Sequence, residues 1–124
     1  MNMAVLAVLV AGLLPIVCAG IAKWGAKAYD NHDPRAWMAR QAGWRMRADA
    51  AQQNSFEAFP FFAAAVVLAL HAGAPAGQVA GWAWLFVALR GLYIFCYVTD
   101  RATLRSVVWL LGLAVVLRLY ILAL

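Results

Sequence analysis

Hydrophobic residues occur in long runs along the chain, and short polar segments separate these runs. The first run, residues 3–22, holds no charged side chain and is long enough to span a hydrocarbon core of roughly 30 Å. Residues 58–89 also lack Asp, Glu, Lys and Arg, but one helix of this length would overshoot the bilayer. Gly and Pro in residues 71–78 interrupt the run, so the pattern predicts a helical hairpin in the middle of the chain.

The pattern as a whole predicts four helices joined by short segments, over residues 3–28, 38–71, 78–98 and 103–123. Residues 30–35 are expected to form a loop, because Asn and Asp favour turns and Pro34 disfavours helix at the residue before it. The predicted fold class is therefore all-α. We expect residues 1–124 to form one domain, an integral membrane four-helix bundle with up-down topology.

The composition agrees with a membrane protein. The chain is 67% hydrophobic and 12% charged, whereas about a quarter of the residues in a soluble domain are charged. The net charge of +5 then bears on topology and on contact with anionic membrane lipids rather than on nucleic acid, which we do not expect as a partner.

Lys and Arg residues are unevenly distributed among the loops and predict the orientation. The loop between the second and third helices has none, and the turn between the third and fourth has Arg101 and Arg105. The first loop and its flanks hold six: Lys23, Lys27, Arg35, Arg40, Arg45 and Arg47. By the positive-inside rule, we expect a multi-pass protein with loops one and three in the cytoplasm and both termini outside.

Two ionisable residues fall deep within the predicted helices. Glu57 and Arg90 each lie about 13–15 Å from the cytoplasmic end of their helix, at a rise of 1.5 Å per residue. An unpaired charge at such depth costs at least ~2.5 kcal/mol. We therefore predict that the two side chains pair or that both line one polar cavity; the alternative is a buried ion pair that only fixes helix register.

Other polar side chains lie near these two. Arg47 and Asn54 share nearly one face of the second helix, and Glu57 follows Asn54 by three residues. Tyr93 and Tyr97 share a face of the third, where they could pack together or contact a ligand. A pocket made by these groups suits a small zwitterionic or anionic ligand beside an apolar ligand from the lipid. We expect no metal site, and we expect Cys18 and Cys96 to be packing residues.

The same residues carry a resemblance to a known family. Arg47-Ala48 followed by Asn54, Glu57, Pro60 and Phe62 resembles the helix-two signature of the MAPEG family, the membrane-associated proteins in eicosanoid and glutathione metabolism. The segment from Arg90 to Tyr93, then Tyr97 and the turn with Arg101 and Arg105, is similar to the family's third helix and its exit. The loop at residues 31–35 resembles bacterial members, which implies the bacterial inner membrane.

The resemblance implies a homotrimer that binds glutathione between neighbouring subunits at the cytoplasmic side. In catalytic members an arginine stabilises the glutathione thiolate, which attacks a lipophilic electrophile or reduces a peroxide. By position, Arg105, or else Arg101, would be this catalytic arginine. The residues expected to bind glutathione are Arg47, Asn54, Glu57, Arg90, Tyr93 and Tyr97.

One position departs from the family's pattern. Glutathione-using members carry a second arginine four residues before the asparagine, where this chain has Ala50; the lost charge-assisted hydrogen bonding is worth about 1.5–3 kcal/mol. Three functions remain open. They are a glutathione-dependent transferase or peroxidase, a non-catalytic scaffold that binds a lipid or another small ligand in the same cavity, and a small proton-coupled transporter.

Overall fold

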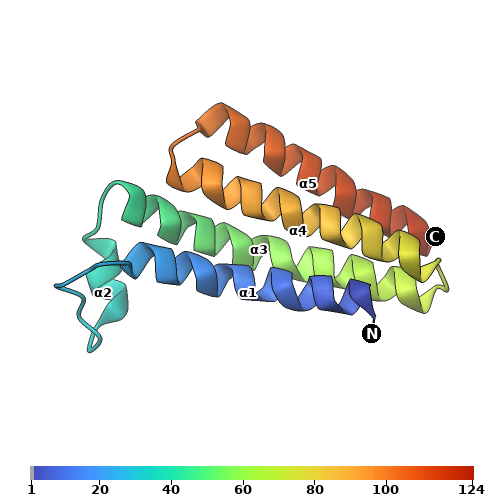
Figure 1. The fold of residues 1–124 in the computed structure, drawn as a ribbon, viewed down its shortest axis with the longest axis horizontal. Helices are drawn as coiled ribbons and strands as arrows, with labels where there is room; N and C mark the ends of the chain where they lie inside the picture. Colours follow the sequence, from blue (N-terminus) through green and yellow to red (C-terminus); the bar gives the residue numbers. More distant parts are fainter. Residues whose placement is uncertain (1) are drawn as a thin grey trace.

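The computed structural model describes residues 2–124 and consists of four long helices and one short one (Figure 1). The long helices are α1 (Met3–Lys23), α3 (Trp44–His71), α4 (Ala76–Val98) and α5 (Ala102–Ala123). Each is long and apolar enough to cross a membrane. The predicted all-α fold, a four-helix membrane bundle, is confirmed.

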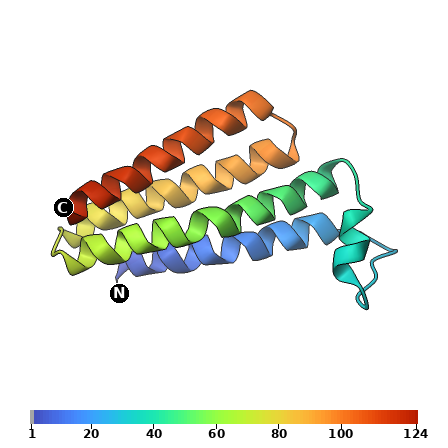
Figure 2. The ribbon, with the colours of Figure 1, turned by 180° about the vertical axis from the view of Figure 1, so that it is seen from behind.

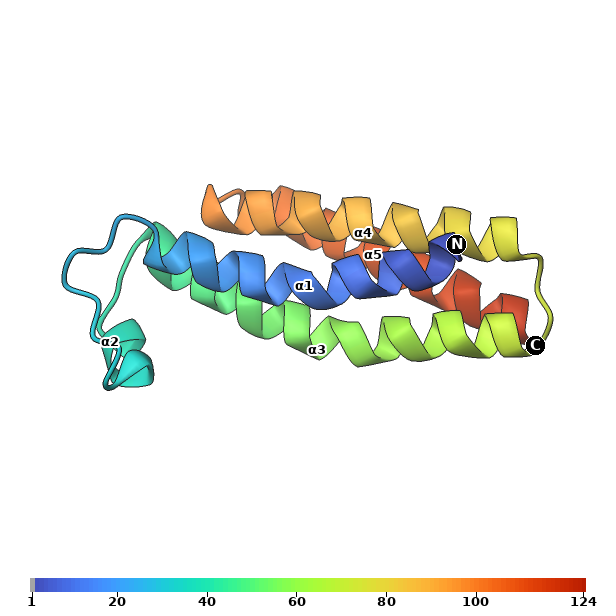
Figure 3. The same ribbon diagram turned by 60° about the horizontal axis from the view of Figure 1, so that its bottom comes forward.

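The four long helices run antiparallel to their neighbours in the chain. In Figure 1 and in the reverse view of Figure 2, both termini and the α3–α4 turn lie at one end of the bundle. The connection from α1 to α3 and the α4–α5 turn lie at the other end. The short helix α2 (Pro34–Ala39) lies beyond this second end of the bundle (Figure 3). This arrangement is the up-down topology that short loops favour.

Small residues and aromatic rings fill the interior. The buried face of α1 carries Ala4, Ala7 and Ala11, which let the neighbouring helices approach closely. At the centre of the bundle, the ring of Phe62 on α3 stacks on that of Phe86 on α4, with centroids 4.0 Å apart. This pair forms a rigid wall beside the site described below.

Four helix boundaries differ from the sequence-based prediction. Helices α4 and α5 begin only two residues and one residue earlier than predicted, at Ala76 and Ala102, whereas the other two differences are larger. Helix α1 ends at Lys23 rather than at residue 28, because Gly25 adopts a left-handed conformation with φ of 66°. Helix α3 begins at Trp44 rather than at residue 38, because Gly43, with φ of 65°, cannot continue a right-handed helix. Both glycines take a conformation that other residues rarely adopt.

The segment before Gly43 forms α2, so the predicted loop at residues 30–35 is wrong at its last two residues. Pro34 begins this helix, where its missing N–H is no loss. The Asp33 carboxylate caps it by accepting a hydrogen bond from the backbone N–H of Ala36 at 3.2 Å.

Two arginines near the start of α3 hold its neighbours. The Arg45 side chain donates to the carbonyl of Ala22 at 2.9 Å, and the Arg47 side chain donates to that of Val98 at 3.1 Å. These carbonyls belong to the last turns of α1 and α4, where the helix itself supplies no partner. The arginines therefore tie three helices together at the end of the bundle where the site lies.

Candidate functional site

Arg90 is the centre of the polar cluster. Its side chain is only 4% exposed, and its Nη2 donates to Asn54 Oδ1 at 2.8 Å and to Ser55 Oγ at 3.2 Å. The guanidinium also lies 4.2 Å from the centroid of the Tyr93 ring. Neutral oxygens and a π face thus stabilise this buried cation.

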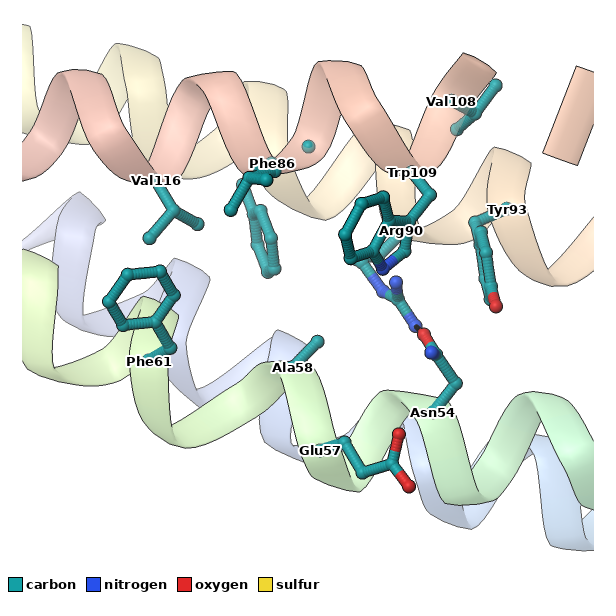
Figure 4. A pocket seen from close by; sticks show the side chains of 12 residues that line it. Asn54, Glu57, Ala58, Phe61, Phe86, Arg90, Tyr93, Val108, Trp109 and Val116 are labelled. Carbon is teal, nitrogen blue, oxygen red and sulfur yellow. Dashed lines mark hydrogen bonds between the residues drawn. The ribbon is translucent and has the colours of Figure 1, made fainter. Parts of the chain in front are cut away.

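Glu57 does not pair with Arg90 in this structure. Glu57 is exposed on α3, and Figure 4 shows its carboxylate set apart from the guanidinium, which reaches Asn54 instead. The predicted ion pair is therefore wrong for residues 2–124. The other expectation, that both residues line one cavity, is what the structure shows.

That cavity, which we call the apolar pocket, has a volume of about 210 Å3 and lies between α3, α4 and α5 (Figure 4). One end is polar, and the rest of the wall is aromatic and aliphatic. The polar end carries Asn54, Glu57, Arg90 and Tyr93, and the remaining wall comprises Ala58, Phe61, Phe86, Val108, Trp109, Gly112, Leu113 and Val116.

A second cavity, which we call the polar pocket, adjoins the first. It has a volume of about 420 Å3 and is lined by Asn54, Tyr93, Arg105, Ser106, Trp109 and Leu110. Asn54, Tyr93 and Trp109 belong to both cavities. A molecule in either pocket would therefore contact these three side chains.

Two arginines flank a pair of tyrosines across the two pockets. The rings of Tyr93 and Tyr97 meet edge to face, with centroids 5.7 Å apart. Arg105 lies over the Tyr97 ring at 4.2 Å, as Arg90 lies over Tyr93. Tyr93 thereby stabilises the Arg90 cation beside the apolar pocket, and Tyr97 stabilises the Arg105 cation beside the polar pocket.

The α4–α5 turn places Arg105 at the pocket. Asp100 adopts φ of 61°, and the backbone N–H of Arg101 donates to the carbonyl of Cys96 at 2.8 Å. This hydrogen bond ends α4 and reverses the chain, so that α5 begins beside the last turn of α4. Arg105 then lines the polar pocket, while Arg101 remains exposed in the turn.

The structure gathers most of the predicted site residues but not all. Asn54, Glu57, Arg90 and Tyr93 line the apolar pocket, and Tyr97 supports Arg105 at the polar one. Arg47 lies apart, since its side chain is bonded to the Val98 carbonyl.

Several residues of the site were not predicted from the sequence, and three of them bear on its chemistry and shape. Ser55 accepts a hydrogen bond from Arg90 and donates one to the carbonyl of Ala51 at 2.8 Å. Trp109 and Gly112 line the apolar pocket from α5. They follow Arg105 by four and seven residues, and this helical spacing on one face is a signal that could have identified them.

Comparison with known proteins identifies the family of this chain. The model of the MAPEG family matches residues 3–124, which is nearly the whole chain. None of the curated proteins and none of the solved structures matches the chain. The family match confirms the resemblance seen in the sequence and covers all four long helices.

Proposed function

The chain belongs to the MAPEG family, and from this premise we propose that it is a glutathione-dependent transferase or peroxidase that acts on lipophilic electrophiles. The observation that carries the proposal is the pair of adjoining pockets, one polar and beside Arg105, the other largely apolar. Such a pair suits a reaction that joins a water-soluble substrate to one dissolved in the membrane.

The groups around the polar pocket and at the polar end of the apolar pocket complement a zwitterionic peptide such as glutathione. Asn54 accepts from Arg90 through Oδ1, so its amide NH2 is left to donate to a ligand carboxylate or carbonyl. Glu57 lies one helical turn further along α3 and carries the charge that an ammonium group requires.

Arg105 is the residue that we propose as catalytic. A cation beside a thiol favours the thiolate and lowers the pKa of the thiol, and the thiolate is the nucleophilic form. Arg105 lines the polar pocket next to Asn54, Tyr93 and Trp109, the side chains that line both pockets. A thiolate held there would face an electrophile in the apolar pocket.

We further propose a homotrimer in the bacterial inner membrane, with loops one and three in the cytoplasm. Glu57 is exposed on a membrane-spanning helix, and a charge facing lipid costs about 2.5–3.5 kcal/mol. A neighbouring subunit packed over this face of α3 would remove the carboxylate from lipid, which supports an assembly in which neighbours share the site.

An alternative function is a non-catalytic scaffold that binds a lipid or another small ligand in the same pockets. The observation that favours it is the missing cation at Ala50. Arg47, which precedes Ala50 on α3, does not replace it, because its side chain is bonded to the Val98 carbonyl.

Glutathione binding by the purified protein in nanodiscs, measured by calorimetry, tests the proposal. We expect binding by the wild type and at least a tenfold loss in Glu57→Gln, which removes the charge that pairs with the ligand's ammonium group. Asp100→Asn makes the same chemical change in the exposed α4–α5 turn, where Asn tolerates the positive φ. This control should bind like the wild type.

Absence of binding at millimolar glutathione would refute the transferase or peroxidase proposal and leave the scaffold as the remaining function. Equal affinity of Glu57→Gln and the wild type would show that glutathione, if bound, does not use the site described here.

A further inference from the structure

We propose that the apolar pocket, whose lining comes from a single subunit, binds the lipophilic co-substrate, and that Gly112 determines the size of the group that it accepts. The chemistry of this co-substrate rests on the proposed function, but the binding site does not. The inference starts from the shape of the pocket and from the two residues that define its opposite ends.

The volume of the pocket limits what can enter. An apolar protein cavity of roughly 150 Å3 is large enough to bind benzene, and the pocket here measures about 210 Å3. It therefore accommodates a single aromatic ring with a short substituent.

Gly112 provides this space. It is buried on α5 and lines the pocket, although glycine is less favourable than alanine in a helix interior. A Cβ at this position would lie 3.9 Å from the Phe86 ring, which is ordinary contact, so alanine fits without strain. A larger side chain cannot displace Phe86 easily, because that ring is stacked on Phe62, and it must occupy the pocket instead.

Arg90 defines the polar end. In the part of the chain that the structure describes, the side chain of Arg90 donates hydrogen bonds from Nη2 alone, so Nε and Nη1 have no acceptor there. No side-chain nitrogen in residues 2–124 is both fully buried and unbonded, so Nε and Nη1 keep some exposed surface, and the cavity that Arg90 lines with Asn54 and Tyr93 is the apolar pocket. A ligand oxygen, such as that of a ketone or nitro group, would satisfy them.

The mouth of the pocket is apolar. Phe61 and Trp109, at 45% and 42% exposure, are the lining aromatics that reach the surface of α3 and α5. Both helices span the membrane. A neighbouring subunit that covers Glu57 would also cover Phe61, one helical turn away on α3, so a ligand from lipid would enter beside Trp109 on α5. The geometry therefore selects lipophilic molecules with a single aromatic ring and an oxygen acceptor near it.

Benzylacetone, a phenyl ring joined by two methylene groups to a methyl ketone, is an unreactive probe of this class. We would measure its binding to the wild type, Gly112→Ala and Gly112→Val in nanodiscs, relative to its partition into nanodiscs without protein. We expect affinity to fall a few-fold in Gly112→Ala and at least tenfold in Gly112→Val, because each added carbon fills part of the pocket.

Gly81 on α4 provides the matched control. It is exposed, and no atom lies within 4 Å of a Cβ built there, so Gly81→Ala and Gly81→Val change helix propensity without touching the pocket. Both should bind benzylacetone like the wild type. Equal affinity of the wild type and Gly112→Val, or no binding by the wild type beyond lipid partition, would overturn the proposal.

The role of Arg90 is tested by changing the ligand, because a variant of this buried residue could fail to fold. Butylbenzene has the same ring and chain without the ketone. We expect benzylacetone to bind roughly tenfold or more tightly than butylbenzene after both are corrected for lipid partition, since a hydrogen bond to a charged donor is lost. Equal affinities would overturn the assignment of Arg90 to a ligand oxygen.

Glutathione calorimetry on the same variants separates this inference from the proposed function. If benzylacetone binding depends on Gly112 while glutathione does not bind, the pocket assignment stands and the transferase or peroxidase proposal fails. If glutathione binds and Gly112→Val leaves benzylacetone binding unchanged, the reverse holds.

Discussion

At the scale of single residues, the decisive feature is how Arg90 is stabilised. A buried guanidinium in a membrane-spanning helix requires compensation, and here it comes from Asn54, Ser55 and the face of Tyr93. Glu57 keeps its charge available at the pocket because it is not consumed by an internal ion pair. The neutral partners therefore leave both charges free to act on a ligand.

This arrangement predicts different stabilities for two neighbouring variants. Asn54→Ala should lower the free energy of unfolding by about 1.5–3 kcal/mol, because a buried cation loses a hydrogen bond. Glu57→Ala should not lower it, because Glu57 is exposed and pairs with no cation within residues 2–124, and removing a charge from a membrane-spanning helix relieves its desolvation cost. Unfolding by denaturing detergent checks both, and a larger loss in Glu57→Ala than in Asn54→Ala would contradict the assignment.

At the scale of helices, the depth of a residue in the membrane could be predicted from the sequence, but the rotation of each helix about its own axis could not. Counting residues placed Glu57 and Arg90 at similar depth, and both do line one pocket. Which side chain of α3 meets Arg90 depends on how the helix is turned about its axis. Apolar residues cover every side of these helices, so hydrophobic periodicity does not fix that rotation, and Asn54 and Ser55 face Arg90 where Glu57 was expected.

The ends of the helices also could not be predicted from hydropathy alone. The four long helices follow from length and hydropathy, whereas Gly25 and Gly43 end or begin helices through positive φ angles that hydropathy does not report. Arg47 was interpreted as a pocket residue because it shares a face with Asn54. Its length lets it reach the Val98 carbonyl instead.

The Arg47 contact predicts a structural role at the end of the bundle. Arg47→Met removes the donor to the Val98 carbonyl and should lower the free energy of unfolding by about 1–3 kcal/mol. Arg40→Met removes an equal charge from an exposed position just after α2 and should have little effect. Thermal unfolding of both variants in the same detergent compares their stabilities. Equal losses of stability would show that the effect comes from the change in net charge and not from the contact with the Val98 carbonyl.

The α4–α5 turn predicts a stabilising substitution. Asp100 adopts φ of 61°, a conformation that glycine takes without steric cost. Asp100→Gly should therefore raise the free energy of unfolding by about 0.5–1 kcal/mol. A decrease in thermal stability would indicate that the Asp100 side chain makes a contact that outweighs the relief of strain.

At the scale of the whole molecule, the distribution of charge predicts the orientation in the membrane. The cation-rich α1–α3 connection and the α4–α5 turn lie at one end of the bundle, and the α3–α4 turn without Lys or Arg lies at the other (Figure 1). The positive-inside rule places the first end in the cytoplasm.

Labelling of intact cells with a membrane-impermeant maleimide tests this orientation. Cys18 and Cys96 are both buried, so the wild type serves as the unlabelled control. Ala72→Cys, exposed at the α3–α4 turn, should be labelled in intact cells, and His32→Cys, exposed in the α1–α3 connection, only after permeabilisation. The opposite pattern would invert the proposed topology and place the polar pocket on the other side of the membrane.

The ultraviolet absorbance of bound glutathione tests directly whether Arg105 stabilises a thiolate, because only the thiolate form gives the signal. We predict a thiolate band for the wild type that persists in Arg101→Ala, whose side chain is exposed in the turn, and disappears in Arg105→Ala, which removes the cation at the polar pocket. Bound glutathione without a thiolate band in the wild type, or a band that survives in Arg105→Ala, would contradict the role assigned to Arg105.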